Sequence, residues 1–132
     1  MTQAAASTRV RPALLPYLLA SASLCTVAVA AATYASASAA LHGAAAAAVA
    51  AFIALPALAV GVPNGTNGIL AAFVVGFFAR MIAVAVGLVL TGARSGAALT
   101  YAAWFFGLYM ATQAVEIAYV WSSSRPSRRT GA

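Results

Sequence analysis

Long apolar runs with almost no charge inside them constrain this chain more than any other feature of its sequence. Only Arg80 and Glu116 carry charge within these runs. Charged residues make up 6% of the chain, whereas a soluble domain carries about 25%. A run of about 20 apolar residues spans the hydrocarbon core of a bilayer as a helix, which satisfies its own backbone hydrogen bonds. We therefore predict an all-α, polytopic membrane protein.

Turn signals and charges divide the apolar region into four predicted transmembrane helices. They form one domain over residues 13–121, with spans at about 13–33, 40–62, 69–90 and 97–121. A polar tail over 1–12 precedes this domain, and a basic tail over 122–132 follows it. Gly61 to Gly68 reads Gly-Val-Pro-Asn-Gly-Thr-Asn-Gly, which predicts a tight loop. The second span is rich in alanine, and Pro56 should kink it near its end.

The first span has an alternative interpretation as a cleaved secretory signal. Two arginines precede it, and Ala35 to Ala39 form a run of small residues like a cleavage site. The apolar stretch of about 20 residues is longer than the usual signal core of about 7–15. A retained helix is therefore favoured, and cleavage would leave three spans.

The positions of the arginines predict the orientation. Five of them flank the four spans: Arg9, Arg11, Arg125, Arg128 and Arg129. Because cytoplasmic flanks carry the excess of arginine, both termini are predicted to lie in the cytoplasm. Arg94 is then a single exception on the outer side. A nucleic-acid partner is not expected, since it requires a continuous basic face.

Aromatic residues fall near both predicted membrane interfaces, as aromatic belts do. Tyr17, Tyr119 and Trp121 are expected near the inner interface. Tyr34 and Tyr101 are expected near the outer one.

The chain lacks the residue types from which catalytic or metal sites are built. It has one His, one Cys, one Glu and no Asp. A hydrolase triad, a pair of carboxylates or a metal site cannot be assembled from these. We predict that the protein is not an enzyme and has no cofactor or metal. The single Cys25 excludes an internal disulfide and is expected to be a small buried side chain.

Arg80 and Glu116 are the candidate functional residues. A charge at mid-membrane costs about 2.5–3.5 kcal/mol, so it usually marks a partner or a function. Arg80 lies about 16 Å into the third span and Glu116 about 8 Å from the inner end of the fourth. Side chains lean toward the helix N-terminus, so these two can meet as a structural ion pair. Two alternatives stay open: Arg80 binds an acidic group of another membrane protein, or Glu116 serves a proton or ion pathway.

The residues around this pair predict two faces in contact with protein. Small residues share the Arg80 face of the third span, at Gly76, Ala83 and Gly87, and suit close helix contact. The fourth span carries a polar stripe within one arc, made of Tyr109, Thr112, Gln113, Glu116 and Tyr119.

The stretch from Gly65 to Trp121 resembles the ATP synthase I chain family, small bacterial membrane proteins encoded beside ATP synthase subunits. Besides the length and the four spans, the resemblance rests on two motifs. One is Gly-Phe-Phe-Ala-Arg-Met-Ile-Ala-Val-Ala-Val-Gly-Leu around Arg80, and the other is Gln113-Ala-Val-Glu116-Ile-Ala-Tyr119. The resemblance implies a role in assembly or stability of the membrane rotor ring, with rotor subunits as partners. It implies Arg80, Gln113 and Glu116 as the partner-binding residues.

Two other function classes fit the size and the number of spans. A small four-helix transporter or lipid-carrier flippase would place an ionisable residue in a substrate path, and Arg80 or Glu116 would have to serve. A purely structural or holin-like membrane protein is the other class. Besides the lipid bilayer itself, a second copy of the chain is a further candidate partner.

Overall fold

The computed structural model describes residues 13–35, 37–92 and 96–125. These residues form four α-helices and one 3₁₀ turn: α1 (Leu14–Tyr34), α2 (Ser38–Gly61), η1 (Val62–Asn64), α3 (Gly65–Thr91) and α4 (Gly96–Ser124). The prediction of an all-α fold is confirmed for this part of the chain. The tails over 1–12 and 126–132, Ser36 of the predicted cleavage run and Arg94 lie outside the described residues.

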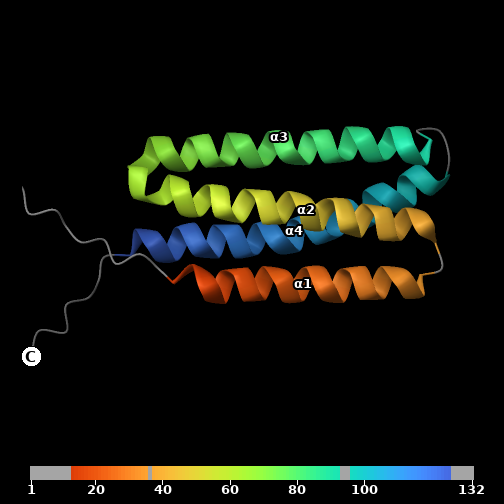
Figure 1. Ribbon diagram of the computed structural model, residues 1–132, viewed down its shortest axis with the longest axis horizontal. Coiled ribbons are helices and arrows are strands. Elements are labelled where there is room, and N and C mark those ends of the chain that lie inside the picture. The colour runs from red at the N-terminus through yellow and green to blue at the C-terminus, as the bar shows by residue number, and fades with distance from the viewer. Residues whose placement is uncertain (1–12, 36, 93–95, 126–132) are drawn as a thin grey trace, which may run out of the picture.

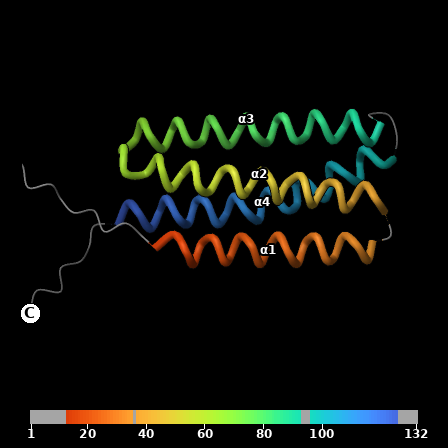
Figure 2. Tube along the Cα trace, in the orientation of Figure 1, coloured from red at the N-terminus to blue at the C-terminus, as the bar shows by residue number. Residues whose placement is uncertain are grey.

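The four helices lie side by side along one long axis, and successive helices run in opposite directions (Figure 1). α2 contacts each of the other three helices, and α1 also contacts α4. α3 packs mainly on α2 and touches α4 over a smaller area. The start of α1, the turn η1 and the end of α4 lie at the same end of the bundle (Figure 2).

Two helical stretches among the described residues are long and apolar enough to cross a membrane. One is Leu14–Tyr34, and the other is Ser38–Thr91, which runs as helical backbone through η1. The described chain thus has three unbroken helical stretches, and the second reverses direction at η1 to give α2 and α3 (Figure 1). α4 is long enough to cross a membrane, but its polar residues lower its mean hydropathy, so it is not one of these two stretches.

Small residues place α2 at the centre of the bundle. Its buried residues recur every three or four positions: Ala39, Ala40, Gly43, Ala44, Ala47, Ala50, Ala51, Ala54, Leu55, Leu58 and Gly61. The larger Val49, Phe52, Ile53 and Val60 lie on its exposed faces. Small side chains let neighbouring helices approach closely. The alanine-rich composition, which gave no specific prediction, therefore builds the main contact surface.

Two glycines of α2 mark its closest contacts with other helices. A Cβ atom at Gly43 would overlap the carbonyl oxygen of Tyr101 in α4 and lie 3.2 Å from the Cβ of Trp104. A Cβ atom at Gly61 would overlap the carbonyl oxygen of Gly68 in α3. Because these neighbours are backbone atoms, no rotamer change can make room for a larger residue.

The predicted loop from Gly61 to Gly68 is too long, since the chain turns within this segment but over fewer residues. Gly61 still belongs to α2, and α3 begins at Gly65 rather than near residue 69. The connection shrinks to η1 because the Asn64 side chain donates to the Val60 carbonyl oxygen at 3.1 Å. Gly65 then turns the chain with a φ of 72°, a conformation that glycine adopts without strain. Pro56 lies inside α2 and does not end it.

The last helix is longer than predicted, since α4 continues to Ser124 rather than ending at residue 121. The hydroxyl of Ser122 donates to the carbonyl oxygen of Tyr119 at 2.8 Å, and that of Ser123 donates to Val120 at 2.6 Å. Serine hydroxyls that bond to the preceding turn in this way allow polar residues to stay helical.

Two tyrosines pack inside the bundle rather than in the aromatic belts where they were predicted. Tyr101 is 1% exposed, and its hydroxyl donates to the Ala83 carbonyl oxygen at 2.7 Å. Its ring occupies the space that a Cβ at Gly87 would need. Tyr119 is also buried, with its ring centre 5.3 Å from that of Tyr17. Cys25, by contrast, is buried as the sequence predicted.

We predict that Gly43→Ala destabilises the bundle by roughly 1–3 kcal/mol, the usual range for overpacking. Gly107→Ala is the matched control, since a Cβ there meets nothing within 4 Å and alanine favours helix. Reversible unfolding in mixed detergent micelles measures both variants. Equal stability of the two would contradict the close α2–α4 contact.

Candidate functional site

Arg80 and Glu116 form a salt bridge inside the bundle. The Nη2 group of Arg80, on α3, donates to Oε1 of Glu116, on α4. Arg80 is 8% exposed and Glu116 is 2% exposed. The two helices run in opposite directions, so the lean of each side chain toward its helix N-terminus brings the charges together. The interpretation of these residues as each other's partners is confirmed.

The Arg80 guanidinium is held by two further contacts. It lies over the ring of Tyr109, with Cζ 4.8 Å from the ring centre, a favourable cation–π geometry. Gly76, one turn earlier on α3, leaves the space that the guanidinium uses, because a Cβ there would lie 2.9 Å from Nη1. The same Cβ would lie 3.2 Å from the Cβ of Ala54, so α2 packs against α3 beside the guanidinium.

Glu116 is only partly satisfied by these neighbours. Its Oε2 atom is buried and has no hydrogen-bond partner among the described residues. Thr112, one turn away, uses its hydroxyl on the carbonyl oxygens of Leu108 and Tyr109, each at 3.1 Å. The ion pair is therefore held by one hydrogen bond instead of the two of a bidentate arginine–carboxylate pair. A buried acceptor without a donor is destabilising, so Oε2 of Glu116 lowers the stability that the ion pair provides.

The predicted polar stripe of α4 faces protein along most of its length. Thr112, Glu116 and Tyr119 are buried, and Tyr109 and Gln113 are half-buried. Gln113 makes no side-chain hydrogen bond within the described part of the chain, so the structure does not bring it into the Arg80–Glu116 pair. Gln113 thus stays a candidate partner-binding residue only because it lies on the polar stripe of α4.

Two contributions to this region were not predicted from the sequence. The stacking of Arg80 on Tyr109 could have been anticipated, because Tyr109 lies two helical turns before Glu116 and shares its face. The link between α1 and α4 at the η1 end of the bundle had no such signal. There the Tyr17 hydroxyl donates to Oγ of Ser122 at 2.8 Å and joins α1 to α4.

The remaining chemistry of the described residues is sparse. They contain no group of three His, Cys, Asp or Glu side chains that could hold a metal ion. Comparison of the chain with protein-family models, with curated proteins and with solved structures finds no match. The site is therefore interpreted from its own geometry and from the sequence motifs.

We predict strong coupling between the two charges. Arg80→Leu or Glu116→Leu alone should cost roughly 3–5 kcal/mol, because each strands an unpaired buried charge. The double variant should lose much less than the sum of the two single losses. Unfolding of the purified variants, together with the amount of inserted protein, measures this. Additive losses would show that the two residues do not interact.

Proposed function

We propose that this chain is a bacterial inner-membrane protein in which all four helices span the bilayer. Large apolar side chains are exposed on each of them, for example Leu19 on α1, Phe52 on α2, Phe78 on α3 and Phe106 on α4. Such a surface suits lipid and not water, because contiguous apolar patches are rare on soluble proteins. The four-helix arrangement satisfies the backbone within each helix, as a bilayer requires.

The polar composition of α4 is compatible with this arrangement. Tyr101, Thr112 and Glu116 lower its mean hydropathy, but all three are buried against other helices. Its outward positions include Leu99, Met110 and Ile117 in addition to Phe106. Lipid would therefore meet an apolar face on α4 as on the other three helices.

In this proposal both chain termini lie in the cytoplasm. The start of α1 and the end of α4 lie at one end of the bundle (Figure 1), and five of the arginines adjoin these two helix ends in the sequence. The excess of arginine marks the cytoplasmic side of a membrane protein.

Reporter fusions test this orientation. A reporter fused after Arg125 that is active only in the cytoplasm should be active, and one that is active only outside should be silent. The same pair of reporters inserted at Gly92, at the opposite end of the bundle, should give the reverse pattern. Outside activity after Arg125 would contradict the proposal.

We further propose that the protein acts by binding a membrane partner, as an accessory protein in the assembly or stability of the ATP synthase rotor ring. The rotor ring as the partner comes from the sequence resemblance, and the incomplete ion pair is the observation that supports contact with a partner. Arg80 gives one hydrogen bond to Glu116, and the guanidinium group has five N–H donors in a fixed fork. A carboxylate from a partner helix can take up this remaining capacity.

The place of the pair in the bundle supports such contact. It lies between α3 and α4, which share less packing than α2 shares with either of them. Gln113 is half-buried on the same stretch of α4 and its side-chain amide is not used within the described residues. Arg80, Gln113 and Glu116 are therefore the residues that we propose for partner binding. Attraction between a guanidinium and a carboxylate is strong in a low-dielectric setting.

Substitution of the arginine tests this partner contact. Arg80→Lys should insert normally and yet capture rotor subunits less well, because lysine lacks the fork that holds a carboxylate with two parallel bonds. Arg125→Lys, beyond the end of α4, is the matched control and should capture them normally. A photo-crosslinking residue at position 113 should trap a rotor subunit, whereas one at the exposed Val27 of α1 should not.

Deletion of the gene provides the second arm of the test. It should reduce the yield or stability of the assembled ring without changing the turnover of complexes that do assemble. Normal ring assembly in the deletion strain, with no rotor subunit crosslinked from position 113, would contradict the assembly role.

A further inference from the structure

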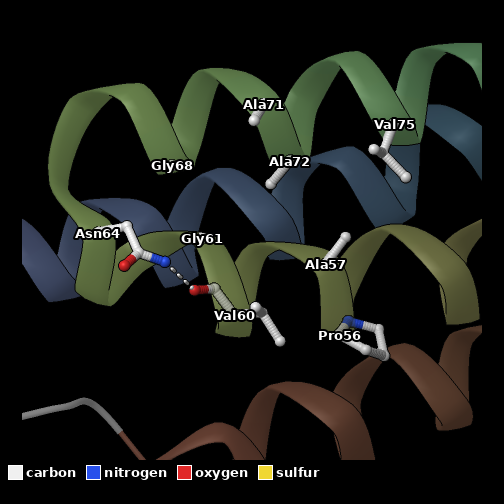
Figure 3. Close-up of a pocket in the computed structure, with 9 residues that line it drawn as sticks. All are labelled: Pro56, Ala57, Val60, Gly61, Asn64, Gly68, Ala71, Ala72 and Val75. Atoms are coloured by element: carbon white, nitrogen blue, oxygen red, sulfur yellow. Dashed lines mark hydrogen bonds between the residues drawn. The ribbon is translucent and has the colours of Figure 1, made fainter.

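A groove of about 470 Å³ lies between α2 and α3 at the η1 end of the bundle (Figure 3). Nine residues line it, and Asn64 is the one among them with a polar side chain. Asn64 stands at the η1 end, whereas Pro56 and Val75 lie at the far end (Figure 3). The groove is therefore polar at one end and apolar along the rest of its length.

The packing of the two helices explains why a hollow forms here. Gly61 and Gly68 bring the backbones of α2 and α3 into contact near η1. Beyond that contact the facing positions are alanines, including Ala57 and Ala71, which are too small to fill the space between the helices. Val60 is 72% exposed and forms part of the open side. The hollow is thus open to the surroundings of the bundle.

Five arginines adjoin, in the sequence, the helix ends that lie at the polar end of the groove. η1, the start of α1 and the end of α4 lie together there (Figure 2). Three arginines follow α4 in the sequence and two precede α1. The formal net charge of the chain is +6, and its one acidic residue, Glu116, is buried and paired. An occupant with an anionic group at this end would be attracted.

We infer that the groove holds one acyl chain of an anionic phospholipid, with the phosphate headgroup at the η1 end. The polarity of the groove matches such a molecule, and the arginines that adjoin the nearby helix ends in the sequence complement the headgroup. The lining on α2 and η1, from Pro56 to Asn64, extends only about 12 Å at 1.5 Å per residue. A flexible chain fits so short a groove better than the helix of a second copy, which is about 10 Å wide. The inference rests on the membrane location and is independent of the ATP synthase role.

Native mass spectrometry of the full chain tests this inference. The protein is released from bilayers that contain equal amounts of phosphatidylglycerol and phosphatidylethanolamine. We expect one phosphatidylglycerol molecule to remain bound to each chain. Ala71→Phe and Val60→Phe, one on each wall of the groove, should each reduce the bound fraction by roughly tenfold or more, because the ring fills the space. Ala85→Phe, at an exposed position of α3 outside the groove, is the matched control and should retain the lipid.

A charge variant separates the headgroup from the acyl chain. Replacement of Arg125, Arg128 and Arg129 by glutamine should remove the preference for phosphatidylglycerol over phosphatidylethanolamine and leave a lipid bound. Circular dichroism checks that each variant keeps its helices. Lipid retained equally by Ala71→Phe, Val60→Phe and Ala85→Phe would overturn the inference. So would equal retention of the two lipids by the unaltered chain, or a dimer that the two groove variants dissociate.

Discussion

The salt bridge between Arg80 and Glu116 is the interaction on which the interior of this bundle depends. Each charge is buried, and neither can stay so alone, because an unpaired charge in a low-dielectric interior is strongly destabilising. The pair therefore fixes how α3 and α4 are rotated about their axes and how far each slides past the other. Two neighbours help to bury the Arg80 guanidinium. Gly76 leaves space for it, and the ring of Tyr109 covers it.

The rest of the packing depends on small residues. In the bilayer location that we propose, the hydrophobic effect does not drive helices together, because lipid tails are as apolar as leucine. Contact then rests on close fit, and the buried alanines and glycines of α2 supply it for all three neighbours. Gly43 and Gly61 let backbone meet backbone, and Gly87 receives the ring of Tyr101. The same small residues leave the open groove near η1 where larger side chains would have filled it.

Part of this architecture could be predicted from the sequence. The all-α class follows from the apolar runs, and the Arg80–Glu116 pair follows from their depth and the lean of their side chains. The central place of α2 could not be predicted, because alanine fills 12 of its 24 positions and hides which face is buried. The Gly61 to Gly68 segment has every signal of a loop, yet one hydrogen bond from Asn64 and the φ of Gly65 shorten it to η1. The inward position of Tyr101 depends on the space beside Gly87, which lies on another helix.

Charge reversal at the two positions tests the central claim, that α3 and α4 are held by one ion pair, most directly. Arg80→Glu alone and Glu116→Arg alone each place two like charges together, so little folded protein should accumulate in the membrane. The double reversal restores opposite charges at the same place, and it should recover most of the folded protein. Equal loss in all three variants would contradict the claim, and so would normal accumulation of either single variant.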